Sequence, residues 1–145
     1  MIIGSILKVK GSTVIAVRPE DSILAVARTL DAHRIGAALV QDEAGRILGI
    51  ISERDIIRGM AGHGPGTTGL PVSQFMTHEL VTVRPETLVT EALALITQHR
   101  VRHLPVLDGS GALLGLVSIG DLVKARIEAA EQEAEALKDY VVSAG

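Results

Sequence analysis

The chain has 145 residues, a length that can bury one hydrophobic core of ordinary size. Hydrophobic residues make up 47% of it and aromatic residues only 1%, so any bound base would rest on aliphatic walls rather than on aromatic stacking platforms. The net charge of −3 and the lack of cysteine argue against a nucleic-acid-binding protein, a disulfide-stabilised domain and a thiolate metal site.

The N-terminal segment reads MIIGSILKVKG and lacks the basic start, apolar stretch and cleavage site of a secretory signal. No apolar run in the chain approaches the roughly 18 residues that a membrane span needs. We therefore expect a cytoplasmic protein without a membrane span.

An internal repeat appears when the chain is laid over itself with a shift of 66 residues. The tetrapeptide VRPE at 17–20 then coincides with VRPE at 83–86, and further identities follow along both copies. Residues 14–58 align with residues 80–124 without a gap. Identities spread in this way indicate a duplicated structural unit.

Each copy carries the same order of local signals. A short β-branched strand (13–17 or 80–83) ends at Arg-Pro-Glu, because proline cannot continue a strand ladder. A helix with one apolar face follows, with Asp21 or Thr87 as its predicted N-cap. Two apolar strands joined by an Asp-x-x-Gly turn predict a hairpin, and a second helix begins near Ser52 or Ser118. The fold class is therefore α/β (α+β): two βαββα repeats that we expect to pack through their sheets as a pseudo-two-fold pair.

A glycine-rich segment lies between the copies, and its composition indicates poor helix and strand propensity. It lacks the Gly-Lys-Ser/Thr ending of a phosphate-binding P-loop. We expect a first repeat at 8–60, a linker at 61–72, a second repeat at 73–126 and a helical extension at 127–145. The helix from Leu122 to about residue 140 has one apolar stripe, expected to pack on its own domain or on a second copy, with docking of another partner as the alternative: Leu122, Ala125, Ala129, Ala136 and Leu137.

Both copies end their last strand in the same pattern, a glycine, two apolar residues, a serine and, three residues later, an aspartate. Serine and aspartate at a helix start form an N-cap arrangement that would by itself explain the pair. Alternatively, the serine hydroxyl and the free helix N–H groups bind a phosphate while the aspartate accepts both hydroxyls of a ribose. The two interpretations are compatible.

The repeat, its two Gly-h-h-Ser-x-x-Asp endings and the sequence HRVRHLPV at 99–106 resemble a tandem cystathionine-β-synthase (CBS) domain pair over about residues 8–126. The chain is similar to stand-alone bacterial proteins of this kind. The resemblance implies an adenosine-containing ligand such as AMP, ATP, NAD or S-adenosylmethionine. It also implies homodimers shaped as flat discs and regulation of a partner protein, whose identity stays open.

The resemblance further implies two ligand sites in clefts between the copies. In the first, Asp121 would hold the ribose, and Arg102 and His103 would contact phosphate. Its full set is Ile15, Ile35, Arg102, His103, Leu116, Ser118, Gly120 and Asp121. The second set is Ile50, Ser52, Arg54, Asp55, Val81 and Val101. Because Gly36 and Ala37 stand where the first site has Arg102 and His103, we expect the first site to favour ligands with several phosphates.

Candidate catalytic chemistry is absent from the sequence. His99 and His103 are four positions apart, but His99 ends a predicted helix and His103 begins a predicted strand, so they do not form the helical zinc motif. Neither repeated serine has a neighbouring base. We therefore expect no metal site, no catalytic residue and no catalytic cofactor. The alternative to a nucleotide-binding regulator is a ligand-independent scaffold that dimerises through its helices.

Overall fold

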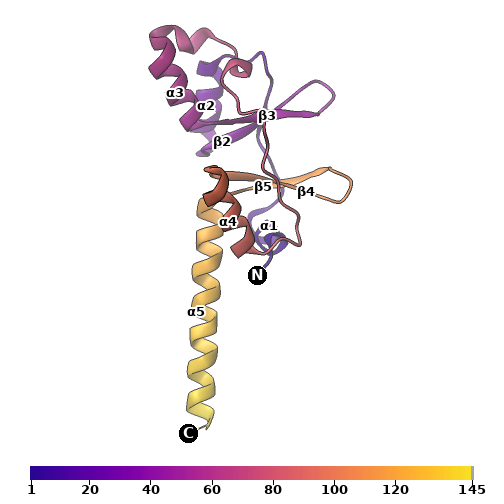
Figure 1. Ribbon diagram of the computed structural model, residues 1–145, viewed down its shortest axis with the longest axis vertical. Helices are drawn as coiled ribbons and strands as arrows, with labels where there is room; N and C mark the ends of the chain where they lie inside the picture. The colour runs from indigo at the N-terminus through magenta and orange to yellow at the C-terminus, as the bar shows by residue number, and fades with distance from the viewer. Residues whose placement is uncertain (145) are drawn as a thin grey trace. The chain divides into compact units, whose positions relative to one another are not determined.

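The computed structural model describes residues 1–144, which fall into two compact units (Figure 1). The first-repeat unit is Val14–Leu80. The second-repeat unit combines Met1–Thr13 with the residues from Val81 onward. The N-terminal thirteen residues therefore pack with the second repeat and not with the repeat that they precede in the sequence.

The first-repeat unit is built on a three-stranded sheet. Strand β1 (Ala16–Val17) pairs in parallel with β2 (Ala37–Gln41), which pairs antiparallel with β3 (Ile47–Ser52). Helices α2 (Ile23–His33) and α3 (Glu53–His63) lie side by side next to this sheet (Figure 1). The buried residues of this core are Val17, Ile23, Val26, Leu30, Ala38, Val40, Ile51, Ile56 and Val72.

The second-repeat unit is built on the hairpin of β4 (His103–Leu107) and β5 (Leu113–Ser118). Helices α4 (Val89–His99), α5 (Ile119–Ala144) and α1 (Ile3–Lys10) complete it. The predicted strand at 80–83 shrinks to one parallel bridge between Val83 and Val106. The predicted hairpins and the α+β class are thus confirmed. The core residues are Ile3, Ile6, Val83, Val89, Ala92, Ile96, Leu104, Val106, Val117, Leu122 and Ala125.

A glycine in each hairpin lets another segment approach closely. In β3, a Cβ on Gly49 would lie 2.6 Å from the backbone oxygen of Thr77. In β5, a Cβ on Gly115 would lie 2.7 Å from the Leu7 side chain on α1. Glycine within a strand often marks such an approach. Each hairpin is therefore covered by the segment that precedes the other repeat in the sequence.

The predicted helix caps Asp21 and Thr87 are wrong. Ser22 is the N-cap of α2, and its hydroxyl accepts a hydrogen bond from the Ala25 N–H at 3.1 Å. The N-cap position of α4 is Leu88. The side chains of Asp21 and Thr87 instead accept hydrogen bonds from the backbone N–H groups of Arg18 and Arg84, each at 3.0 Å. Their oxygens thus close the Arg-Pro-Glu turn that leads into each helix, a local bond that competes with capping.

The glycine-rich segment between the repeats is more ordered than its composition indicated. It forms two 3₁₀ helices, η1 (Gly64–Gly69) and η2 (Val72–Gln74). The fully buried Thr67 hydroxyl contacts the backbone oxygens of Gly64 at 2.8 Å and Gly59 at 3.1 Å. Tertiary contacts therefore override the weak local propensity.

The long C-terminal helix α5 spans Ile119–Ala144 and so extends beyond the predicted range at both ends. Of its predicted apolar stripe, Leu122 and Ala125 are buried, whereas Leu137 is 65% exposed. Within residues 1–144, no helix combines the length and the apolar character needed to cross a bilayer.

Candidate functional site

The repeated serine and aspartate start helices α3 and α5 in the same way. In the first repeat, Ser52 is the N-cap of α3, its hydroxyl accepts the Asp55 N–H at 3.3 Å, and Asp55 Oδ2 accepts the Ser52 N–H at 3.0 Å. In the second, the Ser118 hydroxyl accepts the Asp121 N–H at 3.1 Å, and Asp121 Oδ2 accepts the Ser118 N–H at 2.8 Å. The predicted capping role is confirmed at both positions.

The environment of Asp55 is closed. The residue is only 9% exposed, and Thr77 Oγ1 lies 3.4 Å from Asp55 Oδ1. The Thr77 backbone also exchanges two hydrogen bonds with Ile50 in β3, with N···O distances of 2.8 and 3.0 Å. Both carboxylate oxygens of Asp55 therefore have partners inside the first-repeat unit, and a backbone bridge borders them.

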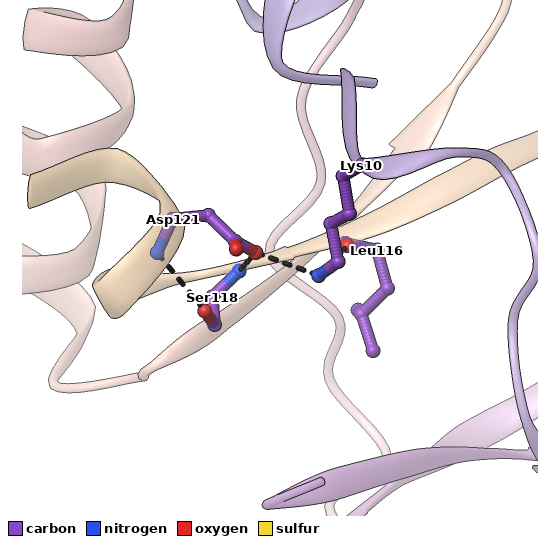
Figure 2. Close-up of polar contacts among 4 residues, drawn as sticks. All are labelled: Lys10, Leu116, Ser118 and Asp121. Carbon is purple, nitrogen blue, oxygen red and sulfur yellow. Dashed lines mark hydrogen bonds and ion pairs between the residues drawn. The ribbon is translucent and has the colours of Figure 1, made fainter. Parts of the chain in front are cut away.

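The environment of Asp121 is more open, and its cation lies closer: Lys10 is at hydrogen-bond distance (Figure 2), whereas Arg58 Nη1 lies 4.0 Å from Asp55 Oδ1. Lys10 Nζ lies 2.6 Å from Asp121 Oδ2 and also donates to the Leu116 backbone oxygen at 2.9 Å. The Lys10 and Asp121 side chains are 40% and 25% exposed. The hydrogen bonds that Lys10 Nζ and the Ser118 N–H donate to Asp121 both reach Oδ2. The Asp121 side chain is thus more accessible to a ligand than that of Asp55, which is 10% exposed.

The Asp121 carboxylate is held in its ionised form. Burial by itself raises the pKa of Asp121, but the Lys10 hydrogen bond, the Ser118 N–H bond and the Lys10 charge outweigh burial. The net result is a pKa below the usual range for aspartate. At neutral pH this helix start therefore presents an acceptor-only carboxylate, as required for binding two vicinal hydroxyls.

Six of the predicted site residues gather at this edge of the second-repeat unit. The start of β4 and the end of β5 meet here, with His103 opposite Ser118 in the antiparallel ladder. The exposed Gly120 lies in the first turn of α5. The Arg102 backbone oxygen accepts the Ile119 N–H at 2.8 Å, and the Arg102 side chain is exposed. The six are Arg102, His103, Leu116, Ser118, Gly120 and Asp121.

Four residues of the second predicted set gather at the matching edge of the first-repeat unit: Ile50, Ser52, Arg54 and Asp55. Arg54 is exposed in the first turn of α3. The Gly36 backbone oxygen accepts the Glu53 N–H at 3.0 Å, just as the Arg102 oxygen serves α5. The two edges therefore share a backbone plan and differ in side chains.

The predicted aliphatic walls belong in each case to the other unit. Ile15 and Ile35 are half-buried against the core of the first-repeat unit. Val81 and Val101 are half-buried against the core of the second-repeat unit. Their contribution to the opposite site stays a prediction.

Lys10 is the site residue that the sequence interpretation missed. It precedes the recognised repeat and lies 111 positions from Asp121. The same 66-residue shift, extended toward the N-terminus, aligns Lys10 and Gly11 with Met76 and Thr77. Thr77 contacts Asp55, so the aligned segment before the first repeat was a candidate to contact Asp121. The segment before each repeat therefore supplies a contact to the aspartate of the other repeat.

Comparison with known proteins identifies the family. The family model "CBS domain" matches residues 9–62 and 72–128. The chain belongs to the CBS domain family. The resemblance to a tandem CBS pair is thereby confirmed, and a CBS pair is a regulatory module.

Individual relatives support the same assignment. The chain is 36% identical over 126 residues to the CBS domain-containing protein CBSX3, mitochondrial, of Arabidopsis thaliana, a match that covers 84% of this chain and 61% of that relative. The crystal structure of ATU1752 from Agrobacterium tumefaciens is 40% identical, with a TM-score of 0.84, covering 86% of this chain and 92% of that one. The CBS pair of protein MJ0100 shares the fold, with a TM-score of 0.76 at 22% identity, over 86% of this chain and 98% of that one.

Proposed function

We propose that this CBS pair is a regulatory module that binds an adenine nucleotide at the Asp121 edge. The observation that carries the proposal is the ionised Asp121 carboxylate, which caps α5 through Oδ2 and is partly exposed beside Lys10. Support also comes from MJ0100, whose CBS pair was crystallised with 5'-methylthioadenosine and S-adenosyl-L-methionine. The adenosine moiety common to these ligands carries a ribose with two vicinal hydroxyls.

The roles of the surrounding residues follow from their positions. Asp121 accepts the ribose hydroxyls, because an ionised carboxylate can only accept hydrogen bonds. The Gly120 N–H is in the first turn of α5, where backbone donors and the helix dipole favour an anion. The exposed Arg102 guanidinium adds a mobile positive charge next to this turn. Together these groups suit a phosphorylated adenosine.

Lys10 is expected to make the site selective for phosphorylated ligands. Its ammonium group contacts the carboxylate that the ribose would use. Because Lys10 is 40% exposed and flexible, it can turn from Asp121 to a ligand phosphate when the ribose arrives. Unphosphorylated adenosine has no phosphate for Lys10 to contact, so its ribose would have to break the Lys10–Asp121 ion pair without forming a new one for Lys10. We therefore expect AMP to bind more tightly than adenosine.

Thermal unfolding of the full chain with a ligand series tests the proposal. The series contains adenosine, AMP, ADP, ATP, NAD, NADH and S-adenosylmethionine. A ligand that binds only the folded state, at 100 times its Kd, stabilises it by about 2.7 kcal/mol. Asp121→Asn removes the acceptor charge and should abolish the shift, while Asp108→Asn in the β4–β5 turn should keep it. If no nucleotide shifts the unfolding of the wild type, the nucleotide-binding proposal is wrong.

A ligand-independent scaffold is the second candidate function. The exposed apolar side chains along α5, among them Ile127 and Leu137, favour it, because they offer a surface for association that needs no nucleotide. This candidate predicts that partner binding is unchanged in a variant carrying both Asp55→Asn and Asp121→Asn. A pull-down of partner proteins with the wild type and this variant separates the two functions.

A further inference from the structure

Helix α5 carries an exposed apolar stripe that its own unit does not cover. Successive members of the stripe are alternately four and three residues apart, the spacing of positions a and d in a coiled coil. The exposed fractions of the large members are 42% for Val123, 54% for Ile127, 65% for Leu137 and 62% for Val141. The complete stripe is Val123, Ile127, Ala130, Ala134, Leu137 and Val141.

This stripe is separate from the face of α5 that packs on the second-repeat core. Leu122 and Ala125, which face that core, are 0% and 6% exposed. From residue 130 to residue 144 every side chain is exposed, and in Figure 1 this part of α5 runs beyond α4 and α1. An isolated helix of about 15 residues is only marginally stable in water. Association along the stripe would stabilise it.

The charges that flank the stripe identify a second copy of this chain as the partner. With Val123 at position d, Arg126 and Glu133 occupy g positions, and Glu131 and Lys138 occupy e positions. In a parallel, in-register pair, each g residue faces the e residue five positions later on the other chain. Arg126 then meets Glu131 of the second copy, and Glu133 meets Lys138. Both contacts join opposite charges.

An antiparallel pair fits these charges poorly. Such a pair, centred between Ala130 and Ala134, brings e residues of the two copies together. Glu131 then faces Glu131 of the other copy, and Lys124 faces Lys138. Like charges at these positions oppose pairing, so the pattern selects the parallel orientation.

We propose that α5 forms a parallel, in-register, two-stranded coiled coil with α5 of a second copy, from Val123 to Val141. β-Branched Ile127 and Val141 at a positions, with Leu137 at a d position, favour two strands over three or four. Ala130 and Ala134 allow the two helices to approach closely at the centre of the stripe. This association does not depend on nucleotide binding.

Engineered cysteines test the proposal, since the natural chain contains none. In the parallel pair, the two copies of residue 137 lie opposite each other, within reach of a disulfide. Full-length Leu137→Cys should therefore cross-link rapidly to a dimer of twice 15.2 kDa under mild oxidation. Asp139→Cys, on the outer face of the same turn, is the matched control and should cross-link at least tenfold more slowly. Equal rates, or no cross-link at residue 137, overturn the proposal.

Charge reversal provides an independent test in the Leu137→Cys background. Glu133→Lys places two lysines face to face and should slow cross-linking several-fold. Adding Lys138→Glu exchanges the charges and should restore the original rate. The proposal is overturned if the double variant is as slow as the single one, because the Glu133–Lys138 contact between chains would then not exist.

Discussion

Asp55 and Asp121 occupy equivalent positions in the two repeats, yet they have different neighbours. Both cap a helix together with a serine three residues earlier. Asp55 is then enclosed by Thr77, whose backbone is bridged to Ile50, whereas Asp121 is paired with the ammonium group of Lys10. One duplicated sequence therefore supports a closed edge and an open one.

The two edges differ in the group that donates a hydrogen bond to the backbone oxygen of Ile50 in β3 or of Leu116 in β5. In the first repeat, the Thr77 backbone N–H donates to the Ile50 oxygen at 2.8 Å. In the second, Lys10 Nζ donates to the equivalent oxygen, that of Leu116, at 2.9 Å. A backbone donor can leave only if its segment moves, but a lysine leaves by rotating its side chain. We infer that the Asp121 edge opens to a ligand at lower cost.

The largest expected effect on stability comes from substituting alanine for Gly49 or Gly115, the two glycines that lie in close contact with another segment. In Gly49→Ala the new Cβ would meet the Thr77 backbone oxygen at 2.6 Å, and in Gly115→Ala it would meet a Leu7 methyl group at 2.7 Å. The Thr77 backbone cannot move aside as the Leu7 side chain can. We therefore expect Gly49→Ala to lower the free energy of unfolding by about 3 kcal/mol and Gly115→Ala to lower it by about 1 kcal/mol. Urea titrations of both variants measure this difference.

Gly62→Ala provides the control for the glycine pair. Gly62 lies within α3, and a Cβ there would have no neighbour within 4 Å. Alanine should therefore stabilise the chain, by roughly 0.5–1 kcal/mol. Equal losses for Gly49→Ala and Gly115→Ala would show that the two edges are equally rigid and would remove the proposed contrast.

The serine caps should respond alike, because the two repeats share this part of their structure. Ser52→Ala and Ser118→Ala each remove the acceptor for one aspartate N–H. Each should cost about 1 kcal/mol of unfolding free energy, the usual value for a lost N-cap. Urea titrations of both variants at neutral pH provide the measurement. A loss in only one variant would mean that the caps are not equivalent despite their common geometry.

The smallest effect concerns Lys10 and depends on pH. Because the pKa of Asp121 is lowered in the folded chain, its ionised form stabilises the fold above the unfolded pKa of about 3.9, and this stabilisation is lost as the pH falls through the folded pKa. Lys10→Met should bring the pKa of Asp121 up and cost at most about 1 kcal/mol at pH 7, since the pair is partly exposed.

NMR titration of the Asp121 carboxyl group measures the pKa in the wild type and in Lys10→Met. Lys8→Met is the matched control, because Lys8 lies on the same helix, is exposed and forms no ion pair within residues 1–144. An unchanged pKa in Lys10→Met would mean that the ion pair is not maintained in solution. The predicted selectivity of the site for phosphorylated ligands would then lose its basis.

Local patterns in the sequence identified the parts of the site that depend on neighbours in the chain. The serine–aspartate caps were predicted correctly, because a cap joins residues three positions apart at a helix start. The caps predicted at Asp21 and Thr87 were wrong, because such side chains can accept a hydrogen bond either from a turn N–H or from a helix N–H. The local sequence does not decide between these two partners. The sequence did not predict the role of Lys10, because Lys10 and Asp121 are 111 positions apart in the chain.

The sequence by itself determined that the chain is a duplicated α+β unit of the CBS family, since the repeat is visible as spaced identities and its hairpins and serine–aspartate helix starts rest on short-range patterns. Only the tertiary structure decided which segment covers which hairpin. The N-terminal helix α1 packs with the second repeat and residues 72–77 pack with the first. The physical reason is that apolar burial and long-range hydrogen bonds choose partners by surface fit in three dimensions, a choice that no local periodicity encodes.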